Sequence, residues 1–446
     1  MLSRRALLKG TAAIAVVSLY RPAFAADAAP IVFVHGDSDA AAIWQTTMWR
    51  FESNGYPRDR LFAISFTNPQ ARDDNSAEQA NRSSTDDELH ELSDFVAKVL
   101  QTTGAPKVAL VGLSRGGYSV RNFIANGGAP KVSAAVLCGT PNHGVFAADG
   151  AMLNNEYNGK GAFLKKLNGD GDSEVTPGVP FLTQRSDGYD LYANPDGAAL
   201  GMPGKPTGVT AEGPALKGAT NLVIGEVDHR ETACSPRAFA EIYRFVTGHA
   251  PTRIAITPEA EVTLNGRVTG VAGETPTNKP VAGAKVEVYA VDPDTGERKG
   301  EALLTRTTEA NGVWGPLKTA STTPLEFVIT APGMPVTHRY RSPFPRSFDQ
   351  LDLRPSAAIP AADASAAAFV QMDRPRGYFG LPRDVILLDG QTPTGVPTGI
   401  PLTWHAKLDL ASADPRPIVA EFNEERIVAR PWPAKDNHVT LIELTY

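Results

Sequence analysis

One short segment, residues 106–117, constrains the fold of this chain more than any other. A run rich in Val and Leu ends abruptly at the sequence Gly-Leu-Ser-Arg-Gly (residues 112–116), and apolar residues resume at helical spacing in residues 118–124. This order predicts a strand, a sharp turn and a helix. Such a turn strains the serine backbone and turns its hydroxyl outward, while the flanking glycines leave room for neighbouring backbone. We interpret Ser114 as a candidate nucleophile, the alternative being an ordinary serine N-cap.

The first 25 residues have the features of an export signal. Paired arginines at positions 4 and 5 precede the apolar run 11–19, and small residues at 23–25 are suited to cleavage. The paired arginines predict a twin-arginine signal peptide over residues 1–25, with a general secretory signal as the alternative. Either signal places the mature protein in the periplasm or outside the cell.

Length and charge narrow the classes of protein that remain. A chain of 446 residues is expected to form more than one domain. Its formal net charge of −6 argues against nucleic acid as a partner. No apolar run after residue 25 is long enough to cross a bilayer, so we do not expect an integral membrane protein.

The two cysteines, Cys138 and Cys234, are too few for a disulfide scaffold, and whether they pair is left open.

Residues 26–251 are predicted to form an α/β domain. Apolar runs suited to strands buried on both faces alternate with helical patterns, and such alternation indicates a mostly parallel sheet with helices on both faces. In the helix expected to follow the polar loop 67–84, Thr85 and Glu88 have the spacing of a capping box. The expected strands are residues 30–34, 60–66, 106–112, 132–137, 179–183 and 221–225.

The rest of the chain has the pattern of an all-β region. Segments rich in β-branched residues are separated by turn dipeptides such as Asn311-Gly312, and none has a helical period. We expect a β-sandwich at 259–354, an Ala/Pro linker at 355–367 and a second β module at 368–446.

A serine nucleophile needs a base and a carboxylate that orients the base. His229 follows the last expected strand and precedes the last helix, which makes it the favoured base over His143 and His249. The acid is expected after the preceding strand. Asp187 is nearest to that strand end and is preferred, whereas Asp190 and Asp196 are remaining candidates whose simpler role is turn formation.

Acyl transfer places negative charge on the former carbonyl oxygen, and fixed amides must stabilise it. We expect one donor to be the N–H of Arg115, directly after the nucleophile. The second is expected to be the N–H of Asp37, in the loop after the first strand. This chemistry requires neither a metal nor a cofactor.

Four segments of the α/β region together resemble the class 2 bacterial lipases, which are secreted α/β-hydrolases. These segments are His35-Gly36, the serine turn, residues 137–144 and residues 54–61. Residues 228–239, followed by a β-rich tail, are similar to archaeal lipases that carry a C-terminal lipid-binding β-barrel. The resemblance implies an α/β-hydrolase fold in which Ser114 and His229 carry over as nucleophile and base.

Two positions depart from this resemblance. Arg115 stands where the family usually has methionine or another apolar residue. Some of these lipases have their acid at the strand end where this chain has Cys138, which cannot serve, so Asp187 is the natural substitute.

Residues 145–177 form a long insertion with no clear strand, and we interpret them as a candidate lid over an apolar acyl cleft, the alternative being a surface excursion. Within this insertion, residues 168–174 alternate oxygen-bearing side chains as calcium loops do. Because the spacing is incomplete, a simple turn is favoured and no metal is assigned.

The sequence thus predicts an exported lipase or esterase that hydrolyses carboxylic esters through an acyl-enzyme on Ser114. Its partners would be an ester substrate and, through the β modules, a lipid surface. The alternative is a polyester or polysaccharide-ester hydrolase whose β modules bind polymer through Trp314, Trp404 and Trp432. A non-catalytic binding protein on a hydrolase scaffold is the third interpretation.

Overall fold

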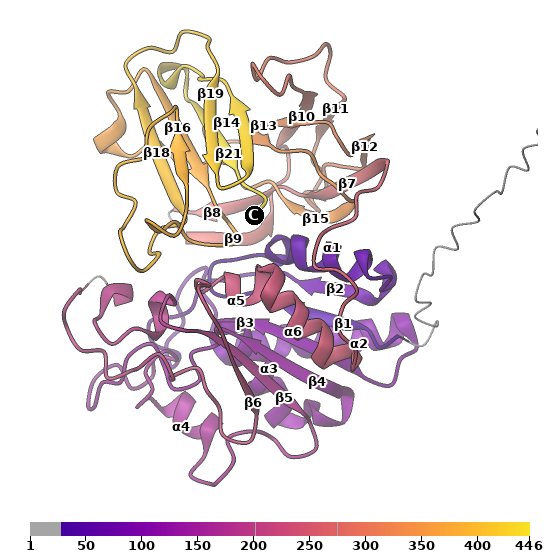
Figure 1. The fold of residues 1–446 in the computed structure, drawn as a ribbon, viewed down its shortest axis with the longest axis vertical. Coiled ribbons are helices and arrows are strands. Elements are labelled where there is room, and N and C mark those ends of the chain that lie inside the picture. The colour runs from indigo at the N-terminus through magenta and orange to yellow at the C-terminus, as the bar shows by residue number, and fades with distance from the viewer. Residues whose placement is uncertain (1–27, 201, 274) are drawn as a thin grey trace, which may run out of the picture.

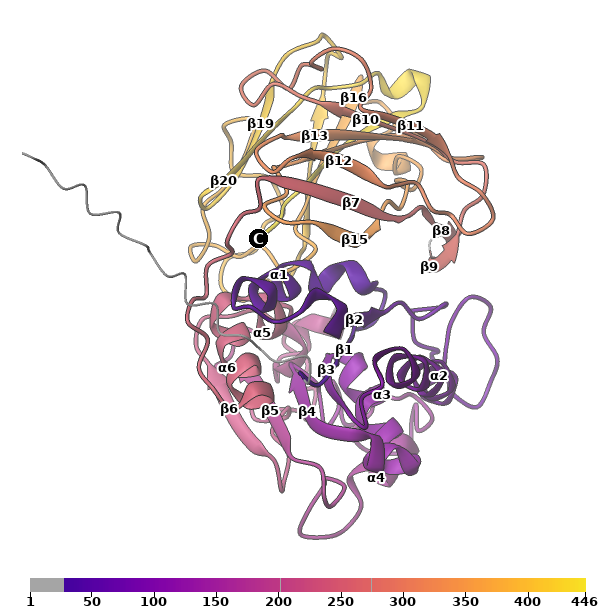
Figure 2. The same cartoon turned by 90° about the vertical axis from the view of Figure 1, so that its right-hand side faces the viewer.

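The computed structural model describes residues 28–200, 202–273 and 275–446, which form two packed units (Figure 1). The N-terminal unit is α/β, and the regular elements of the C-terminal unit are almost all strands, joined by loops. The rotated view places strands β7 and β15 of the second unit beside helix α1 of the first (Figure 2). The predicted signal peptide, residues 1–25, lies outside the described residues.

A six-stranded sheet forms the centre of the α/β unit, in the order β2-β1-β3-β4-β5-β6. Every neighbouring pair is parallel, so the carboxyl ends of all six strands lie at one edge. The strands are β1 (Ile31–Val34), β2 (Leu61–Ile64), β3 (Val108–Leu113), β4 (Val132–Cys138), β5 (Phe181–Ser186) and β6 (Thr220–Ile224). Each of the apolar runs in the sequence supplies one strand.

Helices cover both faces of this sheet. Phe33 packs on one face with residues of α1 (Gln45–Ser53) and α6 (Pro236–Thr247). Val32 packs on the opposite face with α2 (Thr85–Thr103) and α3 (Arg115–Phe123). The predicted α/β-hydrolase architecture is therefore confirmed. Two short helices, α4 (Ala162–Asn168) and α5 (Glu231–Cys234), complete the unit, and none of the described helices is both long and apolar enough for a bilayer span.

The start of α2 differs from its prediction by one residue. Ser84, not Thr85, is the N-cap: its hydroxyl accepts the N–H of Asp87, whose carboxylate accepts the N–H of Ser84. Glu88 is buried and turns inward instead. Its carboxylate is therefore not available to cap the helix.

The two predicted β modules share one sheet. A seven-stranded sheet has the order β11-β10-β13-β14-β21-β16-β18, and its last three strands come from the predicted second module. Strand β21, near the end of the chain, lies parallel to both β14 and β16 and joins the two halves. The strands are β10 (Lys285–Ala290), β11 (Leu304–Thr307), β13 (Leu325–Thr330), β14 (Val336–Arg341), β16 (Ala368–Asp373), β18 (His405–Leu410) and β21 (His438–Glu443).

Three smaller sheets complete the strand-rich unit. They are β12-β7-β15, β17-β19-β20 and the hairpin β8-β9. Their strands are β7 (Glu261–Arg267), β8 (Thr269–Ala272), β9 (Thr275–Pro280), β12 (Leu317–Ala320), β15 (Phe348–Asp352), β17 (Ile386–Leu388), β19 (Ile418–Phe422) and β20 (Glu425–Ala429).

The two units share apolar core. Trp49 of α1 packs edge-on against Phe344 and Phe348, and its indole N–H donates to the carbonyl of Ser347 at 3.0 Å. A continuous cluster of buried side chains extends from the α/β sheet into the strand-rich unit. Burial of this surface holds the two units against each other.

Candidate active site

Ser114 lies at a strained turn between β3 and α3. Its backbone has φ 53° and ψ −123°, a conformation that non-glycine residues rarely adopt. A Cβ added at Gly112 would lie 2.7 Å from the carbonyl oxygen of Gly116, and one added at Gly116 would lie 2.4 Å from that of His35. Both glycines are therefore required by close backbone packing, as the sequence predicts.

Ser114 and His229 line the same cavity, which has a volume of about 520 Å³. Ser114 follows β3, and His229 lies between β6 and α5. Because the sheet is parallel, the segments that follow its strands meet at its carboxyl edge. The structure thus brings the candidate nucleophile and the candidate base to one cavity.

Asp190 orients His229 in this structure. The Nδ1 atom of His229 lies 2.9 Å from each carboxylate oxygen of Asp190, and both side chains are buried. This contact places the ring proton on Nδ1, which leaves Nε2 as the basic nitrogen. The ring of Tyr192 packs edge-on against the imidazole at 4.6 Å and restricts its orientation further.

The structure does not bring Asp187, the acid preferred from the sequence, to His229. Its carboxylate accepts the N–H of Glu226 at 3.1 Å, beyond the end of the neighbouring strand β6. Strand β5 ends at Ser186, so Asp187 is still held at the strand end, and the loop reaches His229 three residues later. Gly188, with φ 129°, allows the intervening turn. Asp190 also accepts the N–H of Tyr192 at 2.9 Å, the turn-forming role expected of it.

The other candidates have structural roles. His143 lies with Nδ1 2.7 Å from the carbonyl oxygen of Gly213 and Nε2 2.9 Å from Glu174, so it shapes its own loop. Asp196 accepts the N–H of Ala198 and forms a turn. His249 is exposed after α6.

The loop after β1 lies directly against the nucleophile. A Cβ added at Gly36 would lie 3.1 Å from the Cβ of Ser114. Buried His35 accepts the N–H of Phe66 at Nε2, so its Nδ1–H donates to the carbonyl of Gly36 at 2.7 Å. Burial lowers the pKa of His35 to about 4, which keeps the ring neutral at physiological pH.

The backbone amides of Asp37 and Arg115 are available for a ligand. Neither N–H donates a hydrogen bond to any other part of the chain that the structure describes. The carbonyl of Gly36 is held toward His35, and a trans peptide directs the following N–H, that of Asp37, the opposite way. The Asp37 carboxylate accepts from Ser38 and from the hydroxyl of Tyr157, which fixes this loop.

The Arg115 side chain turns away from the cavity into the protein. It is buried and forms ion pairs with Glu88 of α2 and with Glu156. It also donates to the hydroxyl of Ser83 at 2.9 Å and to the carbonyl of the same residue at 2.8 Å. The arginine that departs from the lipase pattern therefore ties the nucleophile turn to α2 and to the insertion.

One guanidinium between two buried carboxylates leaves an excess negative charge. Burial raises the pKa of Glu88 to about 8, and the neighbouring Glu156 acts in the same direction against the opposing effect of Arg115. The cluster is electrically neutral when Glu88 carries a proton.

The strand-rich unit forms part of the cavity wall. Tyr378 and residues 402–405 line the cavity together with residues 145–157 of the insertion. Of the three tryptophans proposed as polymer-binding residues, only Trp404 lies at the cavity. Trp314 is fully buried, and Trp432 is half-buried in a stack on His338 at 3.9 Å. Sequence patterns did not indicate that this distant segment reaches the active site.

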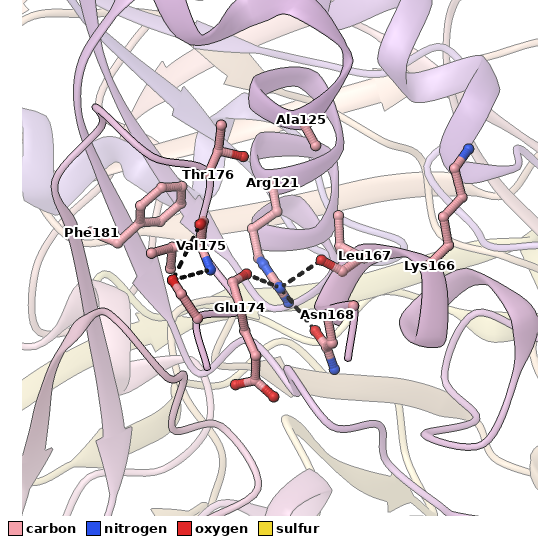
Figure 3. Close-up of a pocket in the computed structure, with 11 residues that line it drawn as sticks. Arg121, Ala125, Lys166, Leu167, Asn168, Glu174, Val175, Thr176 and Phe181 are labelled. Atoms are coloured by element: carbon pink, nitrogen blue, oxygen red, sulfur yellow. Dashed lines mark hydrogen bonds between the residues drawn. The ribbon is translucent and has the colours of Figure 1, made fainter. Parts of the chain in front are cut away.

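The two parts of the 145–177 insertion differ in position. Residues 145–157 contribute side chains to the active-site cavity. The later part forms α4 and surrounds a separate, smaller pocket (Figure 3). There the guanidinium of Arg121 is bonded to oxygens of Leu167, Asn168 and Glu174. Residues 167–174 are thus anchored to α3, and only the earlier part is placed to cover the active site.

Cysteines and metal-binding groups offer no further chemistry here. Cys138 and Cys234 are both free and buried. Burial raises the pKa of each thiol, that of Cys234 to about 12, so neither is a reactive thiolate. Within the described ranges, no group of three or more His, Cys, Asp or Glu side chains is arranged to hold a metal ion.

A parallel sheet with a serine at a strained turn after β3 and a histidine after β6 defines the α/β-hydrolase class. Comparison with protein families agrees with this class. Residues 28–174 match the model of the class 2 lipases, and residues 260–358 match the lipase C-terminal domain. Residues 28–174 are therefore similar to the class 2 lipases and residues 260–358 to the lipase C-terminal domain, as the resemblance in the sequence indicated. These matches support a carboxylic ester hydrolase.

Solved structures that are similar to about half of this chain include the following three. Lipase BlEst2 of Bacillus licheniformis in its mature form is 22% identical, with 50% of this chain and 93% of that chain covered and a TM-score of 0.35. The product of gene lin2722 from Listeria innocua is 16% identical, with coverages of 51% and 97% and a TM-score of 0.35. The monoacylglycerol lipase of Paleococcus ferrophilus is 12% identical, with coverages of 50% and 96% and a TM-score of 0.33.

Proposed function

We propose that this protein is an exported serine esterase or lipase that hydrolyses carboxylic esters through an acyl-enzyme on Ser114. One observation carries the proposal: Ser114 and an Asp190-oriented His229 line a single cavity. Along the chain the serine comes first, then the acid and then the histidine, which is the order found in α/β-hydrolase triads. Export is proposed from the twin-arginine pattern in residues 1–25.

The chemistry follows from the roles of these groups. The Ser114 oxygen attacks the ester carbonyl carbon while His229 Nε2 takes its proton. The resulting oxyanion accepts hydrogen bonds from the N–H groups of Asp37 and Arg115. His229 then gives the proton to the departing alkoxide, which leaves as the alcohol. Water repeats the attack on the acyl-enzyme with His229 as base, and the acid and free serine are released.

The apolar lining of the cavity favours a substrate with an apolar acyl chain. Apolar side chains line much of the cavity, and three of them are also exposed to solvent: Met152 at 57%, Leu402 at 38% and Trp404 at 37%. An exposed apolar patch at the mouth of a site is suited to a lipid surface. This favours water-insoluble or long-chain esters over small soluble ones.

A second candidate is a polyester or polysaccharide-ester hydrolase. The exposed indole of Trp404 at the cavity supports it, since aromatic rings stack on polymer units. Trp314 and Trp432 give no such support, because Trp314 is fully buried and the ring of Trp432 is stacked on His338 away from the cavity.

Turnover on an ester chain-length series tests the proposal. The mature protein is assayed on p-nitrophenyl esters from acetate to palmitate, on emulsified triolein and on a polyester film, beside Ser114→Ala and His229→Ala. We expect wild-type turnover to rise with chain length and both variants to be inactive on every substrate. Hydrolysis confined to the film would favour the second candidate, and undiminished activity of Ser114→Ala would refute both.

A further inference from the structure

The loop that carries His229 is held from outside the α/β unit. Residues 228–231 contact the segment 374–383, which follows β16 in the strand-rich unit. We propose that Arg374 and Arg383 are positioning residues for His229, an inference that rests on the proposed function. Their ion pairs with Asp228 and Glu231 set the place of the imidazole in the cavity that Ser114 also lines.

Asp228 receives the first set of contacts. Its side chain is fully buried, and its Oδ2 accepts from Arg374 at 2.9 Å, from Arg383 at 3.3 Å and from the N–H of Tyr378 at 2.7 Å. Its Oδ1 accepts the N–H groups of Arg230 and Glu231 at 2.9 and 3.0 Å. The same carboxylate therefore fixes the turn directly after His229 and fastens it to the other unit.

Glu231 receives the second set of contacts. It forms ion pairs with Arg374 and, at 2.8 Å, with Arg383, and it accepts the N–H of Asp228 at 2.8 Å. Two carboxylates of the loop thus face two guanidinium groups whose side chains are only 5% and 12% exposed, and Arg383 also pairs with Asp384 at 2.8 Å. Removing one guanidinium leaves a buried carboxylate uncompensated, and the loop must move to hydrate it.

Arg230 anchors the loop at a third point. Its guanidinium pairs with Asp39 at 2.9 Å and donates to the carbonyl of Pro375 at 3.0 Å. His229 is thus flanked on both sides by residues that the strand-rich unit holds, while its own ring turns to Asp190 and the cavity. A displacement of about 1 Å at a reacting group lowers the rate by about a hundredfold.

The segment 374–383 lies beyond both regions that match known families, residues 28–174 and 260–358. Its contacts give the final part of the chain a role in the chemical step, separate from any role in holding substrate or lipid.

The test compares Arg383→Ala, Arg383→Lys and Glu231→Gln with Arg416→Ala in the full mature chain. Arg416 is a matched control because it pairs with Asp389 at 2.6 Å in the same unit and contacts none of residues 228–231. Steady-state rates on p-nitrophenyl butyrate are divided by the concentration of sites titrated with a fluorophosphonate. We expect kcat of Arg383→Ala and Glu231→Gln to fall about tenfold to a hundredfold with KM nearly unchanged. Arg383→Lys is expected to recover part of the loss, and Arg416→Ala to match wild type.

A scaffold role alone would lower the melting temperature and leave kcat per titrated site unchanged, and that result overturns the proposal. Should Arg383→Ala fail to fold, the same comparison of kcat per titrated site is made with Arg383→Lys and Glu231→Gln. These two variants keep the size and polarity of the side chains. A failure of the proposed function is distinguishable, because Ser114→Ala would then retain activity whatever the rates of the Arg383 and Glu231 variants.

Discussion

His229 Nδ1 and the carboxylate of Asp190 face each other at 2.9 Å, with both side chains buried. Residues 187–189 separate this carboxylate from the end of β5, and it still meets a histidine that follows β6. Distance along the chain from a strand end therefore does not decide which acid orients the base.

Replacing Asp190 is expected to impair catalysis strongly. Asp190→Asn allows the neutral imidazole to take the wrong tautomer, and the reference for such a change in a serine triad is a loss of kcat of about 10⁴. Asp187→Asn is the matched control, because Asp187 contacts the N–H of Glu226 and not His229. Rates on a soluble ester check both variants. Equal losses in the two would contradict the assignment of Asp190.

His35 is expected to support the oxyanion site through the Gly36 carbonyl. His35→Asn keeps an N–H close to the position of Nδ1, whereas His35→Gln places its amide closer to Nε2. Loss of an oxyanion donor lowers kcat by about 10²–10³, and a misplaced donor should cost less. We therefore predict that kcat decreases in the order wild type, His35→Asn, His35→Gln. The reverse order of the two variants would argue against support of the oxyanion site by His35 through Gly36.

Trp404 is expected to set chain-length preference. Its exposed indole lines the cavity at the end that the strand-rich unit supplies. Trp404→Ala removes apolar contact area, so KM for a p-nitrophenyl palmitate substrate should rise several-fold while that for the acetate stays constant. A uniform change across the series would place the acyl chain elsewhere.

Glu88 is expected to make stability depend on pH. Its pKa is about 8 in the folded protein, above the ordinary carboxylate value, mainly because it is buried. The stability from protonated Glu88 is therefore fully present below about pH 4.5 and is lost as the pH rises through 8. The difference between the melting temperatures at pH 5 and pH 9 should be smaller in Glu88→Gln than in wild type. An identical difference in the two proteins would refute Glu88 as the source of this pH dependence.

Local patterns in the sequence predicted the α/β unit well. The six strands, the glycine-flanked turn at Ser114 and the position of His229 after the last strand all follow from apolar runs and turn chemistry. The inward turn of Glu88 also had a signal, because Glu88 shares helical spacing with the buried Leu92 and Val96. A charged residue on an apolar stripe indicates a buried partner, here Arg115.

Contacts between distant segments could not be predicted in the same way. Strand β21 inserts between β14 and β16, and no periodicity within it reveals those neighbours. The approach of residues 374–383 to His229 depends on how the two units pack. The sequence leaves Asp190 as a candidate behind Asp187, because loop geometry after a strand is not encoded in residue spacing.

Labelling with a fluorophosphonate shows whether Ser114 is the nucleophile. The mature enzyme is treated with a fluorophosphonate probe, and the modified peptide is identified by mass spectrometry. We predict a single adduct on Ser114, absent in Ser114→Ala and formed far more slowly in His229→Ala. An adduct on another residue, or none on catalytically competent protein, would contradict it.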